Sequence, residues 1–206
     1  MKKILFTITM LMTSVFVHAQ SSFLNSSTAF LRAGIKVGPN INKINGTGYD
    51  QAFNLNYHIG GYVQIKLTER VGIQPELIFS QTTAKTVSNF HDIYQNSGAD
   101  PNSNLANTHL NYLSIPLLAN FGGKYFKFQV GPQYSILMSQ DKNLIQNGKT
   151  AFKNGDFSVL GGLWFQFGKH LNLSGRYIVG LSNVNDLHSN EKWKSQGIQL
   201  GIGYSF

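Results

Sequence analysis

The chain has 206 residues, of which 42% are hydrophobic and only 13% are charged, and its 17 basic and nine acidic residues give a formal net charge of +8. Soluble globular domains carry about 25% charged residues, so much of a water-facing surface is missing. The absence of cysteine excludes a disulfide framework, a thiolate zinc site, a cysteine nucleophile and a lipidated N-terminal cysteine. A chain of this length holds one domain or two very small ones.

The N-terminus predicts a secretory signal peptide at residues 1–19. Lys2 and Lys3 precede an apolar run from Ile4 to Val17, and Ala19 ends a cleavage-site triplet. The run has 14 residues, fewer than the ~20 that a membrane-spanning helix needs, and an uncleaved anchor is the less favoured alternative. After cleavage, residues 20–31 would form a short N-terminal segment and the net charge would fall to +6.

Residues 32–206 alternate apolar and polar residues with period two, which indicates β-strands with one apolar face. Eight strands are predicted, at 32–41, 55–68, 70–83, 109–121, 124–138, 156–168, 169–183 and 193–206. The second, fourth and sixth are followed by tight turns, whereas the connections 42–54, 84–108, 139–155 and 184–192 are long and polar. This pattern predicts an all-β fold, an eight-stranded antiparallel up-and-down transmembrane β-barrel.

The composition of the strand faces favours this barrel over a soluble one, which would alternate in the same way with its apolar face inward. In the strand at 124–138, one face is aromatic and aliphatic, and the other carries Lys127, Gln129, Gly131, Gln133 and Ser135. A face in bulk water would carry many lysines and glutamates. Small and amide side chains instead suit a narrow barrel interior.

Aromatic residues gather near both ends of the predicted strands, as in the two aromatic girdles of a membrane barrel. The band near the long loops contains Tyr57, Phe79, Tyr134 and Phe157. The band near the short turns contains Phe121, Phe126, Phe165, Phe167, Tyr204 and Phe206. Ordinary core aromatics of a soluble sandwich are the alternative interpretation.

The positions of the acidic residues predict one buried ion pair. Seven of the nine acids lie in or beside the long loops, Asp156 among them, and Glu69 lies in a short turn, so only Glu76 is expected within the barrel wall. Its register points it inward, and an unpaired carboxylate there would cost several kcal/mol. We therefore expect Glu76 to meet Arg176 or one of the lysines that share the inward register, Lys36, Lys66 and Lys127, in a lumen ion-pair network. Such a network would plug and order the lumen, and a gate or transport site is the alternative.

Several segments together resemble the PorT-like outer-membrane β-barrel family, which is common in Bacteroidetes. They are residues 34–40 (GIKVGPN), 72–81 (GIQPELIFSQ), 110–118 (LNYLSIPLL), 131–133 (GPQ), 176–181 (RYIVGL) and 199–206 (QLGIGYSF). The resemblance implies an eight-stranded barrel in the outer membrane, in a family whose members mostly have no assigned activity. The last residues also resemble the C-terminal aromatic signal read by the outer-membrane assembly machinery, which implies that Tyr204 and Phe206 direct assembly.

Four prolines, Pro39, Pro75, Pro116 and Pro132, fall inside predicted strands. Proline removes a hydrogen-bond donor that lipid cannot replace, so local bulges are expected at these positions.

No motif for chemistry is evident, so no cofactor, metal site or catalytic residue is predicted. His58, His91, His109, His170 and His188 lack metal-ligand spacing and are expected in loops or at barrel ends. The excess lysines and arginines are dispersed, so contact with anionic lipid head groups is favoured and nucleic-acid binding is not expected.

Three functions remain open. The first is a structural or interaction barrel, without catalytic activity, whose lumen is filled by its own side chains and whose long extracellular loops meet partners. The 84–108 loop, with His91, Asp92, Tyr94 and Asp100, is the best candidate for a protein-partner surface. The second is a narrow channel for small solutes or ions. The third is a lipid-modifying enzyme, which would need a serine or histidine with an acidic partner near the outer rim.

Overall fold

The computed structural model describes residues 30–142, 144–145, 151–186 and 192–206. The predicted signal peptide and nearly all of the predicted segment 20–31 lie outside the described residues. Residues 32–206 form a unit of their own. None of the helices in the described part of the chain is both long enough and apolar enough to cross a membrane.

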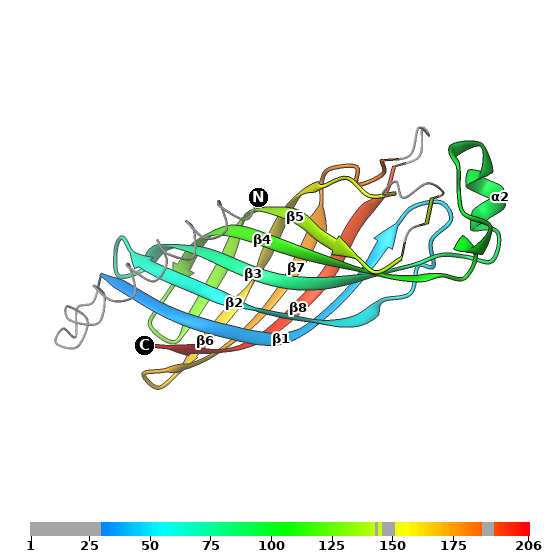
Figure 1. Ribbon diagram of the computed structural model, residues 1–206. Coiled ribbons are helices and arrows are strands. Elements are labelled where there is room, and N and C mark those ends of the chain that lie inside the picture. Colours follow the sequence, from blue (N-terminus) through cyan, green and yellow to red (C-terminus); the bar gives the residue numbers. More distant parts are fainter. Residues whose placement is uncertain (1–29, 143, 146–150, 187–191) are drawn as a thin grey trace, which may run out of the picture. The chain divides into compact units, whose positions relative to one another are not determined.

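Eight antiparallel strands, each paired with its neighbours in the chain, close into a barrel (Figure 1). They are β1 (Leu31–Asn45), β2 (Asn54–Lys66), β3 (Val71–Lys85), β4 (Asn107–Gly122), β5 (Phe126–Gln140), β6 (Gly155–Phe167), β7 (Leu171–Gly180) and β8 (Lys194–Ser205). Pairing of β1 with β8, from Gly34↔Ser205 to Asn45↔Lys194, closes the sheet. The predicted fold class, strand number and strand order are confirmed.

Strand borders differ from the expected ones mainly at the long-loop end. β1 continues to Asn45 instead of ending at Ile41, because β8 pairs with it as far as Lys194. β7 ends at Gly180 instead of Asn183. Polar asparagines and lysines stay in the ladder here, so period-two hydrophobicity alone could not mark where the strands end.

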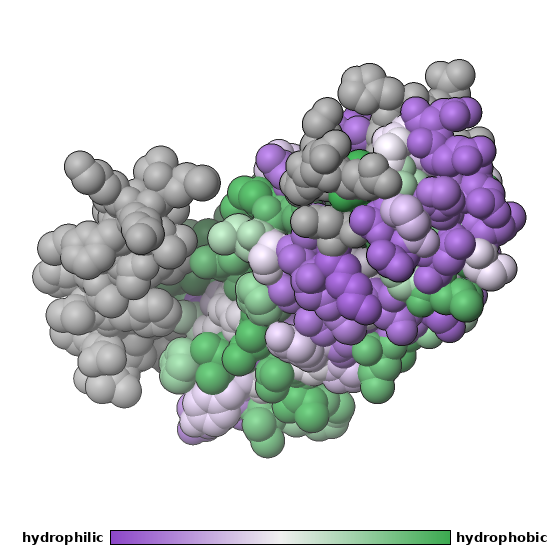
Figure 2. All heavy atoms as spheres, turned by 45° about the vertical axis from the view of Figure 1, so that its right-hand side comes forward, coloured by the Kyte–Doolittle hydropathy of each residue, from purple (hydrophilic) through white to green (hydrophobic). Residues whose placement is uncertain are grey.

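The two faces of the barrel wall have opposite chemistry. Along β5 the outward residues Phe128, Val130 and Tyr134 are exposed, whereas Gln129 and Gln133 are buried inside. Figure 2 shows hydrophobic side chains over the wall, and hydrophilic ones gathered at the end of the barrel that carries the long loops. Since apolar residues cover the wall and polar residues fill the inside, the barrel is suited to a lipid environment.

The loop after β3 has internal structure. It contains helix α2 (Phe90–Tyr94) and two short 3-10 helices, Gln95–Ser97 and Pro101–Ser103, which the sequence patterns did not indicate. Its aromatic residues pack with those of the other long loops into an apolar cluster, which we call the apolar cap. The apolar cap consists of Ile44, Tyr49, Ala84, Phe90, Tyr94, Ala99, Leu110, Tyr112, Leu144, Ile145, Ala151, Phe152, Val184 and Trp193.

The expectation of bulges at the four prolines is wrong. The one register shift in the described ladders lies between Asn111 and Tyr112, away from any proline. Along each strand, the pairing register before the proline is the same as the register after it. At the proline itself, the ladder to the preceding strand in the barrel lacks two residue pairs. Pro75, Pro116 and Pro132 pair normally with the following strand. In an antiparallel sheet the N–H and C=O groups of one residue point to the same neighbour, so a proline weakens one ladder only.

Glycine lets the strands approach closely at such an interruption. The carbonyl oxygen of Leu117 on β4 lies where a Cβ atom on Gly131 would be, directly before Pro132. In the same way, the carbonyl oxygen of Leu200 on β8 lies where a Cβ atom on Gly38, directly before Pro39, would be. A side chain at either position would push two strands apart.

This packing predicts that Gly131→Ala destabilises the barrel by about 1–3 kcal/mol, as overpacked positions do. Gly161→Ala on β6 is the matched control, because the nearest atom to its added Cβ atom lies at 3.9 Å, an ordinary contact. Urea unfolding in detergent micelles measures both variants. Equal stability of the two variants would contradict the close approach of β4 and β5.

Candidate functional site

A buried ion pair lies at the centre of the barrel lumen. Arg176 on β7 donates from Nη1 to Glu76 Oε2 and from Nη2 to Glu76 Oε1, both at 2.7 Å, in a bidentate pair. Lys36 on β1 lies 3.4 Å from Glu76 Oε2. Each of the three residues is at most 4% exposed, so the pair is shielded from water. Two basic side chains share one carboxylate.

Amide side chains complete the hydrogen bonding around the ion pair. Gln129 Oε1 accepts from Arg176 Nε at 3.0 Å and from Nη2 at 2.7 Å, and Gln74 Nε2 donates to Glu76 Oε1 at 2.6 Å. Lys36 Nζ donates to Gln199 Oε1 at 3.3 Å. Buried charges are tolerable when geometry and supporting hydrogen bonds are good, and each charged group here has several partners.

The two remaining lysines of the expected network lie nearer the short-turn end. Lys127 is half-buried and donates to Gln64 Oε1 at 3.5 Å, so it reaches Glu76 only through Gln64 and Gln74. Lys66 is exposed at the end of β2, and no described contact joins it to Glu76. The structure thus brings Glu76, Arg176 and Lys36 together and leaves the other two lysines at the edge of the lumen.

A second side-chain layer fills the lumen toward the short turns. The ring of Trp164, which is fully buried, lies edge-on to Tyr62 with 5.1 Å between the ring centroids. Tyr62 Oη lies 2.8 Å from Ser205 Oγ and accepts from Asn172 Nδ2 at 2.8 Å. This layer fills the lumen near the short turns, the ion pair fills its centre, and the apolar cap lies at the long-loop end.

The expectation that Glu76 is the one acid within the wall is wrong. Asp156 on β6 points inward and is 5% exposed. Ser182 donates to its Oδ1 at 2.8 Å, and Ser195 and Ser158 donate to its Oδ2 at 2.6 and 3.3 Å. Asp156 is two residues from the inward-pointing Ser158, so strand alternation predicts that it also points inward. Because Asp156 lies beside a long loop in the sequence, we expected it with the acids of that loop.

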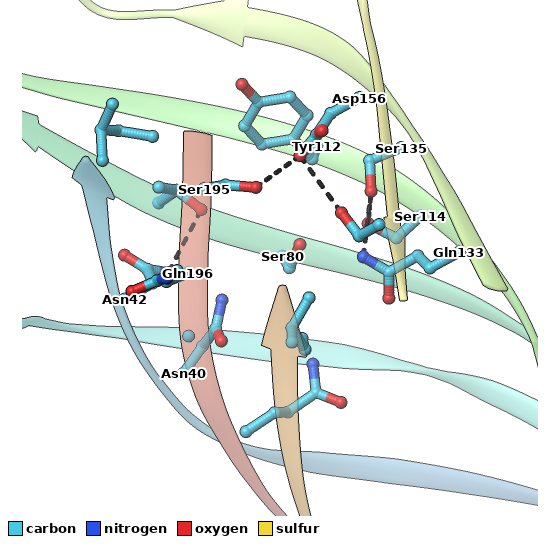
Figure 3. Close-up of a pocket in the computed structure, with 16 residues that line it drawn as sticks. Asn40, Asn42, Ser80, Tyr112, Ser114, Gln133, Ser135, Asp156, Ser195 and Gln196 are labelled. Carbon is cyan, nitrogen blue, oxygen red and sulfur yellow. Dashed lines mark hydrogen bonds between the residues drawn. The ribbon is translucent and has the colours of Figure 1, made fainter. Parts of the chain in front are cut away.

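A polar cavity of about 50 Å³ lies between the ion pair and the apolar cap (Figure 3). Asp156, Asn40 and Gln199 are among the residues that line it. A water molecule needs about 10–15 Å³ of such space, so a few small occupants fit. The cavity is too small for an open aqueous pore.

His58 does not lie in a loop or at a barrel end, as expected, but fully buried on the inner face of β2. Alternation along β2 places it inward with Asn56, Tyr62 and Gln64, which are also buried. His91 lies on α2, His109 and His170 lie at barrel ends, and His188 is outside the described residues. Within the described part of the chain, no three histidine or acidic side chains come together as a metal centre would require.

The rim of the barrel carries a histidine–carboxylate pair, the feature that a lipid-modifying enzyme would need there; a second such pair, His91 and Asp92, lies on α2 at 3.5 Å. His109 Nδ1 lies 2.7 Å from Asp141 Oδ2, and both side chains are about two-fifths exposed. Burial raises the pKa of Asp141, but the hydrogen bonds from His109 outweigh this effect and hold it below its usual value of 3.8. Among the described residues, no hydrogen bond joins a serine hydroxyl to His109.

The aromatic residues assigned to the two bands lie on the outer face of the wall. Tyr57, Tyr134 and Phe157 are exposed near the long loops and Phe79 is half-buried beside Tyr57, with their ring centroids 6.4 Å apart. Near the short turns, Phe126 packs on Phe165 at 5.1 Å. The other exposed members at this end are Phe121, Phe167, Tyr204 and Phe206.

A family model described as outer membrane protein beta-barrel domain matches residues 18–186. The chain belongs to this family. Its members' location, the cell outer membrane, agrees with the polar lumen and the apolar wall. No curated protein sequence matches the chain.

Solved structures support the same fold for this outer-membrane barrel. Ail, the attachment invasion locus protein of Yersinia pestis, is 13% identical with a TM-score of 0.50, and the match covers 85% of this chain and 99% of Ail. Neisserial surface protein A is 12% identical with a TM-score of 0.52, covering 86% and 98%. At such identities the likeness concerns the fold alone.

We expect Glu76→Gln to destabilise this outer-membrane barrel by about 3–5 kcal/mol, because Arg176 and Lys36 would remain buried without their counter-charge. The double variant Glu76→Gln with Arg176→Met should recover part of the loss. A double-mutant cycle by urea unfolding in micelles measures the coupling. Asp92→Asn changes an exposed side chain of α2, so it is the matched control and should leave stability unchanged. Additive losses at Glu76 and Arg176 would contradict the pairing.

Proposed function

We propose that this protein is a non-conducting, non-catalytic outer-membrane barrel that acts as an interaction platform through its long extracellular loops. The observation that carries the proposal is the 86–106 loop, which is held in one shape and still presents apolar side chains. Phe90 and Tyr94 are buried in the apolar cap, whereas Ile93 and Leu105 are 38% and 64% exposed. The loop is therefore built on a rigid base, as binding loops commonly are.

The conformation of Leu105 supports a binding role for this loop. Leu105 has φ 51°, the one positive φ among the described residues other than glycines. A bulky residue in this region is strained, and such strain persists only where the surroundings impose it. Its N–H donates to the carbonyl oxygen of Val87 at 3.2 Å, which holds the exposed leucine in place.

The part of the loop that faces a partner differs from the one expected. Tyr94 is 2% exposed and donates to the Thr47 carbonyl oxygen at 2.8 Å, so it anchors the loop. Asp100 accepts from the N–H of Asn102 and caps a 3-10 helix. The exposed surface is instead Ile93 and Leu105 with the carboxylate of Asp92, whose side chain is 74% exposed.

A protein partner suits this surface better than a polyanion. Ail has been crystallised in complex with sucrose octasulfate, a heparin analogue. In the present chain, acidic and basic residues are interspersed at the loop end, as in the pair of Lys85 Nζ and Asp50 Oδ2 at 3.1 Å. Hydrogen bonds from the backbone N–H of Ala52 and from the side-chain ammonium of Lys85 hold the pKa of Asp50 below its usual value of 3.8, so this carboxylate stays negative at neutral pH.

The remaining parts of the proposal rest on sequence alone. They are export by a signal peptide at residues 1–19, assembly directed by Tyr204 and Phe206, and membership of the PorT-like branch of the family. Contact of the outer wall with membrane lipid follows from its exposed apolar residues.

The partner is tested by photo-crosslinking in intact cells from an amino acid placed at Ile93 or Leu105. We expect a discrete crosslinked protein from both positions, because the two exposed side chains lie on one folded loop. A crosslinker at Glu69, in the short turn between β2 and β3, is the matched control and should not reach that partner. No product from either loop position, with the barrel folded, would refute the interaction role.

The narrow channel is the alternative function, and the filled lumen argues against it. The purified barrel should show no stepwise conductance in planar lipid bilayers, because the ion-pair group, the Tyr62–Trp164 layer and the apolar cap each block the axis. Steady single-channel currents that change in the Glu76→Gln variant would support the channel.

A further inference from the structure

Asp156 is a buried carboxylate without a cation. No lysine, arginine or histidine in the described part of the chain lies within ion-pair distance of it, whereas Glu76 has two cations. Its three described partners are neutral serine hydroxyls. Buried charges in proteins are normally paired or bound to an ion, so a counter-charge is expected close to Asp156.

Lys36 does not meet this need, because its contacts lie elsewhere. Lys36 Nζ points to Glu76 Oε2 and to Gln199 Oε1, at 3.4 and 3.3 Å. Gln199 lies between Lys36 and the cavity, which it also lines. Asp156 therefore faces polar, uncharged groups in the cavity.

A second atom in the same cavity lacks a partner. Asn40 is 5% exposed and donates from Nδ2 to the carbonyl oxygen of Gln81, but its Oδ1 accepts no hydrogen bond among the described residues. Buried polar atoms nearly always have a partner, so an orphaned acceptor that lines a cavity points to an occupant. A cation at Asp156, together with a water molecule that donates to Asn40 Oδ1, would satisfy both groups.

The rest of the lining is rich in oxygen atoms. Figure 3 shows serine hydroxyls and amide groups around the cavity, with Asp156 bonded to Ser195. Serines that donate to Asp156 keep oxygen lone pairs that a cation can use. The oxygen-bearing side chains that line the cavity are Asn40, Asn42, Ser80, Thr82, Tyr112, Ser114, Gln133, Ser135, Asp156, Ser158, Ser195, Gln196 and Gln199.

We propose that this cavity binds one small monovalent cation, of sodium or potassium size, at Asp156, with water between the ion and Asn40. Oxygen ligands suit hard cations, and a single carboxylate balances one positive charge. Calcium sites use several carboxylates and six to eight oxygens, and no group of three acidic or histidine side chains exists in the described residues. The volume of about 50 Å³ admits such an ion with water and excludes large organic cations.

The apolar cap borders the site at the loop end. Ile44 and Tyr112 belong to the apolar cap and also line the cavity. A cation in this cavity binds the folded barrel and not the unfolded chain, so it is linked to folding by mass action. The bound ion would strengthen the contact of Asp156 on β6 with Ser195 on β8.

The test is urea unfolding of the purified protein in detergent micelles at constant chloride, with sodium exchanged for N-methyl-D-glucamine, a cation too large for the cavity. Above the dissociation constant, each tenfold rise in sodium should lower the unfolding equilibrium constant of the wild type about tenfold. Potassium, measured separately, shows which ion is preferred.

Asp156→Asn should abolish this dependence, and Asp92→Asn, on exposed α2, should retain it. Asn40→Leu removes the orphaned oxygen and should weaken the dependence, and it carries the test if the Asp156 variant does not fold. The readout is the response to sodium, which a purely structural loss would leave unchanged. Equal stability of the wild type in sodium and in N-methyl-D-glucamine, or an equal response in Asp156→Asn, would overturn the proposal.

Discussion

The structure depends on one constraint: in the hydrocarbon of a bilayer, each backbone N–H and C=O group must find its partner within the protein. A closed sheet meets this constraint because no strand is left at an edge, and pairing of β1 with β8 closes this one. Each proline interrupts one ladder without changing its register, and Pro75, Pro116 and Pro132 pair normally with the strand on their other side, which holds the barrel together there. Glycines before Pro39 and Pro132 allow neighbouring backbones to close in at these points.

Closure turns the polar face of every strand into a small interior, and the interior must then satisfy its own polar groups. Glutamine and asparagine suit this task because each amide both donates and accepts, so chains of bonds run from Gln64 through Gln74 to Glu76. Arg176 gains a bidentate carboxylate and a glutamine oxygen, which together use its planar donor geometry. The result is a filled lumen rather than a water-filled pore.

The long loops also bury side chains against one another, outside the membrane. Aromatic residues from loops far apart in the sequence, such as Tyr49, Phe152 and Trp193, pack into the apolar cap with ring centroids 4.8 to 6.2 Å apart. Burial raises the pKa of Tyr49 well above its usual value, so its hydroxyl stays neutral. This cap gives the 86–106 loop a rigid base, and two of its members, Ile44 and Tyr112, also line the cavity beside Asp156.

The sequence by itself determined the barrel, its eight strands and its location. Period-two alternation over a chain poor in charge is typical of few folds besides a membrane barrel. Short turns that alternate with long loops indicate the up-and-down topology. The inward register of Glu76 and Arg176 was also readable, because strand parity places side chains without any knowledge of their partners. Only the tertiary structure decided which inward residues meet. Ring closure places β1, β3 and β7 around one axis, so Lys36, Glu76 and Arg176 converge although 140 positions separate the first from the last. It also placed Asp156 and His58 inside the barrel and gathered the loop aromatics, since these contacts join segments that no local pattern relates.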